Sequence, residues 1–213
     1  MQLIDLSHNI EQGMPCYPGT PEPEFHPLSL IEEEGFAEQL LTISSHTGTH
    51  VDLPSHIISS GASLDAFGIE RFAGKGVVID VRAVSGGIIG TGDLQPFQSI
   101  IKECEFVLLC SGWSDYWGSS DYFRNYPVLS NDAARWLAGL GLKGIGVDMI
   151  SLDQPDSADF PVHRLLLQNG LVIIENLASL LPLMFHAFTF CCFPLKIVKA
   201  EASPVRAVAF IHS

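Results

Sequence analysis

Phe106-Val-Leu-Leu-Cys110 is a run of five consecutive apolar residues in the middle of the chain. A continuous apolar run of this length is typical of a strand that is buried on both faces. Similar runs recur on either side of it: Gly76-Val-Val-Ile-Asp-Val81, Gly144-Ile-Gly-Val-Asp148, Leu171-Val-Ile-Ile-Glu175, Phe188-Thr-Phe-Cys-Cys-Phe193 and Val205-Arg-Ala-Val-Ala-Phe-Ile211. Together they predict a protein organised around a buried sheet.

Helical patterns are few. The clearest covers residues 131–140, where Ser130 or Asn131 can cap the start and Gly141 the end. A shorter helical stretch at residues 163–168 stops at an Asn-Gly pair just before an apolar run. The expected fold class is therefore α/β, with a mixed sheet and few helices.

Residues 11–30 contain five prolines, and we expect an ordered loop there rather than a regular element. The chain shows no repeat, low-complexity tract or linker. A length of 213 residues is ample for a buried core. We therefore expect one domain over residues 1–213.

The composition excludes several classes of protein. The chain is 47% hydrophobic and 16% charged, unlike a disordered chain, and its net charge of -13 argues against binding nucleic acid or anionic membranes. No apolar run reaches the roughly 18 residues of a membrane span, and the start lacks a basic and apolar leader. A cytoplasmic protein is expected. The cysteines, odd in number, are expected to be free thiols: Cys16, Cys104, Cys110, Cys191 and Cys192.

The densest set of chemically active side chains lies between residues 45 and 56. It contains three of the eight histidines and one aspartate: His46, His50, Asp52 and His56. Neutral imidazole and carboxylate are the ligand set of zinc, manganese and iron. Four such residues on one short segment with Gly48 and Pro54 are hard to explain by packing, so we favour a metal site.

The spacing of these residues constrains the backbone. A helix is disfavoured by the Thr and Gly residues and by Pro54. An extended strand places the even-numbered residues on one side, but separates His46 from His50 by roughly 13 Å. We therefore expect a bent or bulged segment, with Gly48 supplying irregular backbone and Pro54 fixing the exit. His56 then stands beside the metal as a base or a further ligand.

Two more candidate ligands lie far along the chain. His163 begins the short helix and Glu175 ends the following strand, so both fall at one edge of a helix–Gly–strand reversal. A carboxylate at the buried end of a strand needs a partner, and a metal ion is one. From local sequence alone, a capping Glu175 paired with Arg or backbone amides explains the residue equally well.

These motifs carry a family resemblance. The segment His46-x-Gly-Thr-His50-x-Asp52-x-Pro54-x-His56 resembles the signature of the cyclase-like metal-dependent hydrolases, which include bacterial kynurenine formamidase and isatin hydrolase. Further similar pieces extend over nearly the whole chain: Asp5-Leu-Ser7, Gly13-Met-Pro-Cys-Tyr17-Pro-Gly19, His163 with Glu175-Asn176-Leu177, and Ala202-Ser-Pro-Val-Arg-Ala207.

The resemblance implies a swivelling β/β/α domain that forms a homodimer or larger homo-oligomer. It implies that His46, His50 and Asp52 bind a first metal, and that Asp52 bridges to a second one. His163 and Glu175 would complete that second site, and His56 would transfer a proton. Members use one or two Zn²⁺ ions or a single Mn²⁺, and the formamidases act in tryptophan catabolism.

The resemblance further implies a metal-dependent amidohydrolase of the arylformamidase kind, acting on an N-formyl or cyclic amide. A bound metal ion supplies activated water and polarises the carbonyl. We expect Tyr17, in the proline-rich loop, and Trp113, after a buried strand, to contact the substrate. The alternative is that these aromatic residues pack in the core or at a subunit interface, which explains the neighbouring Tyr116 and Trp117 at least as well. No G-x-S-x-G elbow favours a serine hydrolase.

Three alternatives remain open at this point. An isatin-type lactam or lactone hydrolase, or a polyketide-type cyclase, would need the same residues. A non-catalytic metal-binding protein belongs to a different class, but structural zinc usually has four closed Cys or His ligands. A catalytically silent relative acting as a scaffold is the third, although every signature position is present.

Overall fold

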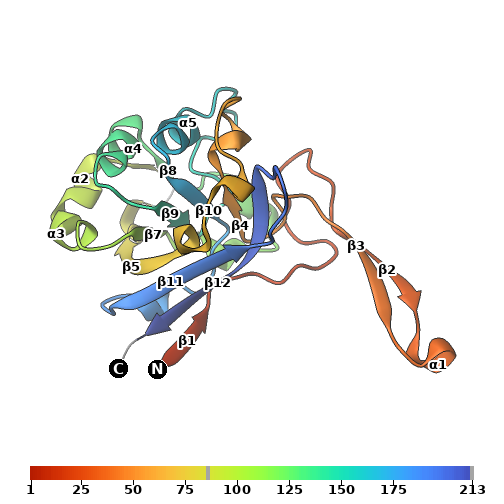
Figure 1. The fold of residues 1–213 in the computed structure, drawn as a ribbon. Coiled ribbons are helices and arrows are strands. Elements are labelled where there is room, and N and C mark those ends of the chain that lie inside the picture. Colours follow the sequence, from red (N-terminus) through yellow and green to blue (C-terminus); the bar gives the residue numbers. More distant parts are fainter. Residues whose placement is uncertain (85–86, 212–213) are drawn as a thin grey trace.

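A computed structural model of the protein describes residues 1–84 and 87–211. Its main sheet follows the order β1-β12-β11-β5-β7-β9-β10-β4, and β4 also pairs with β12, so the sheet closes on itself (Figure 1). The strands of this sheet are β1 (Gln2–Asp5), β4 (His50–Asp52), β5 (Ala73–Asp80), β7 (Phe106–Cys110), β9 (Gly144–Val147), β10 (Val172–Glu175), β11 (Phe188–Pro194) and β12 (Ala202–Ile211).

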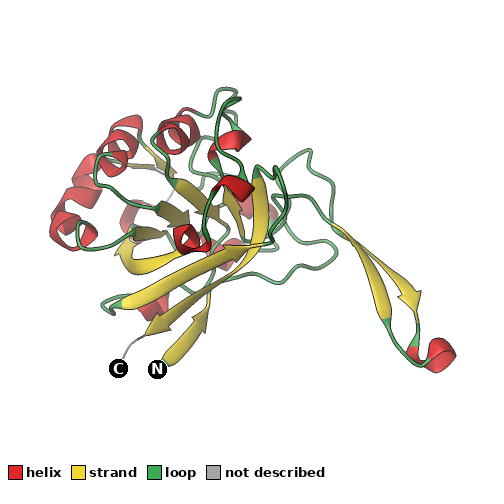
Figure 2. Cartoon of the chain, viewed as in Figure 1, coloured by secondary structure: helices red, strands yellow, loops and turns green. Residues whose placement is uncertain are grey.

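Neighbouring residues of β7 serve two separate cores. Val107 and Leu109 pack in the core beneath the helices, whereas Phe106 and Leu108 pack with the aromatic residues of β11. Strands β5, β7, β9 and β10 run parallel, as expected for runs that are apolar on both faces. The helices beside them lie on one side of the sheet (Figures 1 and 2): α2 (Thr91–Leu94), α3 (Gln98–Ile101), α4 (Asn131–Ala138) and α5 (Pro161–Gln168).

The predicted fold class is confirmed: this is an α/β fold with a mixed sheet and few helices. All the apolar runs form strands. The predicted start of helix α4 is confirmed, because the Ser130 hydroxyl accepts a hydrogen bond from the Ala133 amide. Its predicted end at Gly141 is wrong: the helix ends at Ala138, with Gly139 as the C-cap. Helix α5 begins earlier than predicted, at Pro161, a residue suited to the first turn.

The prediction of a loop over residues 11–30 is wrong in part. Residues 24–29 form β2 (Glu24–Ser29), which pairs with β3 (Glu38–Thr42) through a short helix, α1 (Ile31–Glu34). Pro27 lies within β2, where the register shifts before Ser29. A two-stranded ribbon tolerates proline because each strand has a neighbour on one side only, so a residue that cannot donate a backbone hydrogen bond on the other side breaks no pairing. The ribbon projects away from the rest of the chain (Figure 2).

Two further features complete the architecture. β6 (Ile88–Ile89) and β8 (Val128–Leu129) form a small parallel pair. The terminal strands β1 and β12 pair with each other, which supports the single domain proposed for residues 1–213. Among the described residues, no helix has the length and apolar character needed to cross a membrane.

Candidate metal and active site

Strand β4 carries the histidine-rich segment into the centre of the site. It lies between β10 and β12, with His50 opposite Glu175 and Asp52 opposite Ile173 in the antiparallel register with β10. The expected bend is present: Gly48 has a φ of +63°, and a 3₁₀ turn begins at Pro54 directly after the strand. This shape brings side chains together that a straight strand would keep apart.

One group of ligand atoms comes from this segment alone. Asp52 Oδ1 lies 2.9 Å from His46 Nδ1 and 3.4 Å from His50 Nε2. His50 and Asp52 are buried, and His46 is largely so. One ligand atom from each of the three residues lies within 4.8 Å of the others, so together they could hold one ion.

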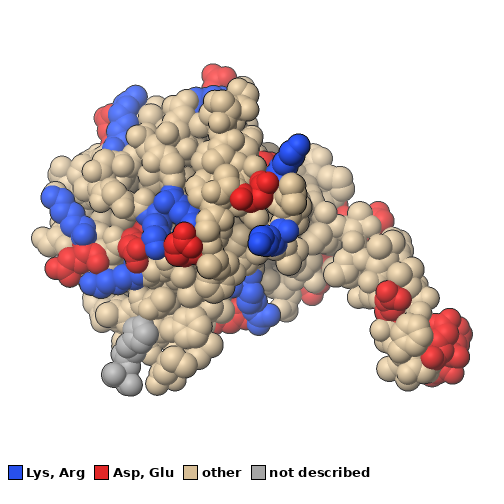
Figure 3. Space-filling model, viewed as in Figure 1, with Lys and Arg blue, Asp and Glu red and all other residues tan. Residues whose placement is uncertain are grey.

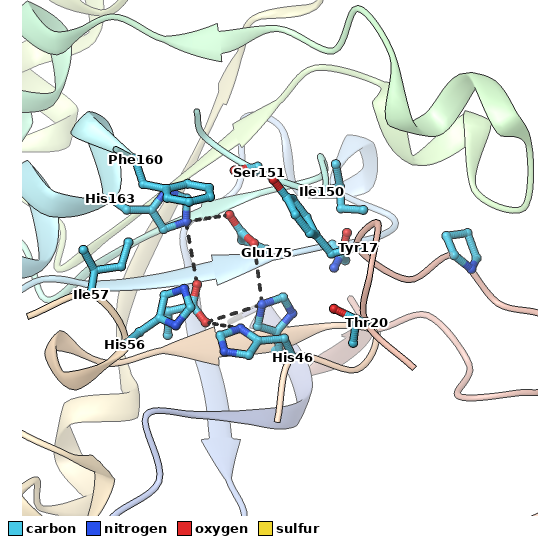
Figure 4. Close-up of a pocket in the computed structure, with 14 residues that line it drawn as sticks. Tyr17, Thr20, His46, His56, Ile57, Ile150, Ser151, Phe160, His163 and Glu175 are labelled. Carbon is cyan, nitrogen blue, oxygen red and sulfur yellow. Dashed lines mark ion pairs between the residues drawn. The ribbon is translucent and has the colours of Figure 1, made fainter. Parts of the chain in front are cut away.

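A second group shares Asp52 with the first. Asp52 Oδ2 lies 3.8 Å from His163 Nε2, which in turn lies 3.1 Å from Glu175 Oε1 (Figure 4). All three residues are buried, and their ligand atoms again lie within 4.8 Å of one another. The predicted approach of His163 to Glu175 is confirmed. Because its two oxygens face different groups, Asp52 has the geometry of a bridging ligand.

The chemistry of these groups fits divalent metal ions. Three buried atoms lack a hydrogen-bond partner here: His50 Nε2, Asp52 Oδ1 and Glu175 Oε1. Among the described residues that line this site, none is Lys or Arg to balance the two buried carboxylates. Burying unpaired charge and unsatisfied polar atoms is costly, and a metal ion would satisfy both requirements.

The orientation of His50 is fixed by the backbone of its own segment. Its Nδ1 lies 2.9 Å from the Gly48 carbonyl oxygen and donates to it, which leaves Nε2 directed at the carboxylates. Asn176 donates to the same carbonyl at 2.8 Å and accepts from the Tyr122 hydroxyl at 2.7 Å. The backbone at Asn176 is left-handed, with a φ of +58°. This buried network holds β4 against the end of β10.

The orientation of His163 is fixed by Asp153. The two lie 2.7 Å apart, from His163 Nδ1 to Asp153 Oδ2, so Nε2 is left to face Asp52 and Glu175. Asp153 also accepts hydrogen bonds from the backbone amides of Val162 and His163, at 2.9 and 3.0 Å. A carboxylate that orients a ligating histidine in this way is common in metal sites.

Electrostatics reflect the crowding of carboxylates and imidazoles. Burial lowers the pKa of His163, but its hydrogen bond to Asp153 and the negative charge of Glu175 outweigh that effect and raise its pKa to about 10. Burial raises the pKa of Asp52, yet the charges of His50 and His46 bring it below its usual value. Without a metal, the carboxylates beside His46 and His163 thus raise the pKa of both imidazoles and favour their protonated forms.

His56 lies at the edge of both ligand groups. Its ring centroid is 4.3 Å from that of His46 and 6.3 Å from that of His163. Burial lowers the pKa of His56; the charge of Asp52 opposes this, and the two neighbouring histidines add to it. The side chain lines the cavity next to the metal-binding groups.

A cavity of about 350 Å³ opens onto both groups. Its walls include Ile57 and Phe160 on the side of His163, and Tyr17 and Ile150 on the other side of Glu175 (Figure 4). Burial raises the pKa of Tyr17, as do the charges of Glu175 and Asp153, so its hydroxyl lies within their electrostatic reach. This volume and apolar lining suit a small aromatic molecule.

The structure does not bring Trp113 to this cavity. Its ring is buried in the core beneath the helices, and its indole nitrogen donates to the Tyr122 carbonyl at 3.0 Å. Conversely, sequence reasoning assigned no role to Asp153, Phe160 or Asn176. Asp153 follows a buried strand, where parallel strands present their functional residues, and that signal was available. No sequence signal pointed to the left-handed backbone conformation of Phe160, which has a φ of +44°.

The closed α/β fold and its open histidine–carboxylate site define a metal-dependent hydrolase. The sequence model described as "Putative cyclase" matches residues 4–154, and the chain belongs to this Cyclase family. A kynurenine formamidase from Salinibacter ruber is 32% identical over 98% of this chain and 97% of its own length. The expectation of a hydrolytic enzyme is confirmed, which sets aside the non-catalytic alternative.

Solved structures agree in fold. Isatin hydrolase A from Labrenzia aggregata, bound to benzyl benzoate, has a TM-score of 0.87 at 26% identity, covering 98% of this chain and 93% of its own. A structure described as a potential metal-dependent hydrolase with cyclase activity has a TM-score of 0.82 at 25% identity, covering 100% and 98%. The similarity therefore extends over the whole length of the chain.

Proposed function

We propose that this enzyme hydrolyses an N-formyl amide of an aromatic amine, as its formamidase relatives are named for doing. The observation that carries the proposal is the position of Asp52, whose two oxygens face separate ligand groups beneath an apolar cavity. Whole-length similarity to kynurenine formamidases supports the same substrate class. A role in tryptophan catabolism follows from that substrate.

The metal site is part of the proposal. His46, His50 and Asp52 would hold a first ion, and Asp52, His163 and Glu175 a second. We propose one or two Zn²⁺ ions, with Mn²⁺ as the alternative, since mixed imidazole and carboxylate ligands suit both. When bound, such an ion activates water and polarises the amide carbonyl.

The remaining roles belong to side chains of the cavity. His56 would accept a proton from the attacking water and return it to the leaving amine, because its imidazole lines the cavity beside the metal-binding groups. Tyr17 and Phe160, which line the cavity, would hold the aromatic ring. We further propose a cytoplasmic enzyme that works as a homodimer or higher homo-oligomer.

A second candidate substrate is a cyclic amide of the isatin type. The observation that favours it is the match to isatin hydrolase A, at a TM-score of 0.87 over nearly the whole chain. Ring opening of a lactam requires the same activated water and the same proton transfer. The two substrates differ in shape and in leaving group, which the metal ligands do not distinguish.

The test is a rate comparison on metal-loaded protein. N-formylkynurenine and isatin are offered separately to enzyme loaded with Zn²⁺ or Mn²⁺, and kcat/KM is measured for each pair. We expect about 10⁴ M⁻¹s⁻¹ or more for the formyl amide. His50→Ala should abolish the rate, and His56→Ala should lower kcat by about 10²- to 10⁴-fold.

The exposed His186 supplies a control, since His186→Ala removes a histidine outside the site and should leave kcat unchanged. A metal-loaded enzyme that opens isatin but leaves the formyl amide intact would overturn the formamidase assignment. Inactivity on both, in protein shown to hold its metal, would overturn the arylamide class. Full activity of the His50 variant would exclude the proposed ligand set.

A further inference from the structure

The three histidines that face the buried carboxylates are not held in the same way. His50 and His163 each hold Nδ1 against an acceptor and present Nε2 to the carboxylates of the site. His46 is turned the other way, because its Nδ1 lies 2.9 Å from Asp52 and its Nε2 faces Glu201. Packing constrains His46 least, since its side chain is 24% exposed, against 4% for each of the other two. Its orientation therefore depends on what its Nε2 meets.

Glu201 reaches this position through the closure of the main sheet. It directly precedes β12, whose first residue, Ala202, pairs with Asp52 of β4. The backbone amide of Leu53, the residue that follows β4, donates to the Glu201 carbonyl at 2.9 Å. The pairing that places Asp52 in the site thus fixes the backbone of Glu201 beside it.

The side chain of Glu201 is held by the residue next to His46. The Ser45 hydroxyl donates to Glu201 Oε1 at 2.5 Å, and the same oxygen lies 3.6 Å from His46 Nε2. A hydroxyl bound to a carboxylate makes a short, charge-assisted hydrogen bond. The contact with His46 is longer than a hydrogen bond, so it acts through charge. We call this arrangement the Ser45–Glu201–His46 chain.

Glu201 is not an ordinary surface carboxylate. Several acidic side chains on the main body lie beside Lys or Arg (Figure 3). Among the ion pairs within residues 1–84 and 87–211, Glu201 pairs with His46 alone, although its side chain is 40% exposed. An ion pair at the surface contributes little to stability, so stability does not explain this one.

A carboxylate beside the outer nitrogen of a ligating histidine is the usual arrangement in metal sites. It fixes the orientation of the ring and raises the basicity of the ligand. The protein already contains one such pair, His163 with Asp153 on the far side of the site. Glu201 stands in the corresponding relation to His46, but it belongs to neither group of potential ligands.

We propose that Glu201 is a positioning residue for the metal ligand His46. The Ser45–Glu201–His46 chain keeps Nε2 turned toward the carboxylate, so that Nδ1 stays directed at Asp52 and the first ligand group. This inference rests on the proposed metal site. It extends that site to a residue whose side chain acts through His46 and binds no ion itself.

The first test measures Zn²⁺ affinity by competition with a coloured chelator. Glu201→Gln keeps the size of the side chain and an acceptor for Ser45 but removes the charge, so affinity should fall by about 10- to 100-fold. Glu201→Asp keeps the charge and should retain more affinity than Glu201→Gln. Glu103→Gln is the matched control, because it removes an ion pair of similar length, 3.5 Å to Lys75, outside the site. The control should bind Zn²⁺ as the wild type does.

The second test asks whether Ser45 acts through Glu201. Ser45→Ala should weaken Zn²⁺ binding on its own, and should add nothing to the loss in Glu201→Gln, because both changes affect one carboxylate. The urea unfolding midpoint of metal-free Glu201→Gln should match that of the metal-free wild type. A merely structural role would lower this midpoint and leave the affinity of the folded protein unchanged.

The possible failures are distinguishable. Equal Zn²⁺ affinity in the wild type and Glu201→Gln, or additive losses from Ser45→Ala and Glu201→Gln, would overturn the positioning role alone. A loss in Glu201→Gln as large as that in His50→Ala would make Glu201 a ligand, which also overturns it. A wild type that takes up neither Zn²⁺ nor Mn²⁺ would overturn the metal site itself, and this inference with it.

Discussion

Glu175 and His50 are direct partners in the antiparallel register of β10 and β4, and His50 Nε2 lies 3.5 Å from Glu175 Oε2. The two residues are 125 positions apart, yet the strand pairing places them on one spot. The same pairing sets Asp52 opposite Ile173, and so aims its carboxylate toward helix α5. The site is therefore a product of strand register as much as of motif.

Removing the metal should abolish activity and leave most of the fold intact. The closed sheet and its two apolar cores do not depend on the ligand groups, so far-UV circular dichroism should change little after dialysis against EDTA. Hydrolysis should return on adding back Zn²⁺ or Mn²⁺. The melting temperature should fall, because buried carboxylates lose their counter-charge. Complete unfolding on chelation would instead identify a structural metal.

Asp153→Asn should weaken metal binding by about 10- to 100-fold without removing a ligand. The amide cannot hold the His163 imidazole in the same way, so Nε2 loses its fixed direction. Competition with a coloured chelator measures the affinity directly. The helix amides of Val162 and His163 also lose charge-assisted bonds, which should cost about 1 kcal/mol of stability.

Asp156 offers the control for this change, because it is an exposed carboxylate in the same connection. Asp156→Asn should leave both metal affinity and stability at wild-type values. Equal metal affinity in the Asp153 and Asp156 variants would contradict the orienting role.

Substitution of Tyr17 should affect substrate binding, whereas substitution of Trp113 should affect the stability of the fold. Tyr17 lines the cavity, so Tyr17→Ala should raise KM for an aryl substrate by about tenfold, equivalent to ~1.4 kcal/mol of binding. Trp113 lies in the core, so Trp113→Ala should destabilise the protein by about 3–5 kcal/mol in urea unfolding. A large KM effect with little loss of stability at Trp113 would restore its expected place in the substrate site.

His8 should make stability depend on pH. Its ring stacks on Trp117 with centroids 3.9 Å apart, its Nε2 is buried without a hydrogen-bond partner, and burial lowers its pKa to about 4. The unfolded chain, with a histidine pKa near 6.5, then binds the proton more readily. The folded protein therefore has its full stability with respect to His8 above pH 6.5, where this histidine is neutral in both states. That stability decreases as the pH falls from 6.5 toward 4, because the unfolded chain takes up the proton first.

The measurement is the difference in urea unfolding free energy between the wild type and His8→Phe. The wild type should lose stability relative to the variant by less than about 1.4 kcal/mol per pH unit, because the ring keeps some solvent screening. His26→Phe is the control, since the His26 side chain is 57% exposed. A difference that stays flat from pH 7 to pH 4 would show that His8 does not titrate in this way.

The local pattern of the sequence was informative about elements and about the chemistry of the site. Continuous apolar runs identified every parallel strand of the main sheet, because burial on both faces leaves no polar alternation. The proline-rich segment led to a wrong prediction at residues 24–29. These residues form β2 only because they pair with β3, which lies beyond helix α1, and no local pattern shows that pairing. Trp113 showed a similar limit: an aromatic residue after a strand fits a pocket or a core equally well.

The sequence by itself determined that this chain has an α/β fold and carries a histidine–aspartate segment suited to metal, because periodicity and ligand chemistry are local properties. The tertiary structure decided how the segment is used. Closure of the sheet set β4 between β10 and β12, so that the two carboxylate oxygens of Asp52 face separate ligand groups. The tertiary structure also placed Asp153 within hydrogen-bond distance of His163 Nδ1. It also left the ribbon of β2 and β3 exposed. Such relations depend on register and packing between residues distant in sequence, and no local pattern encodes them.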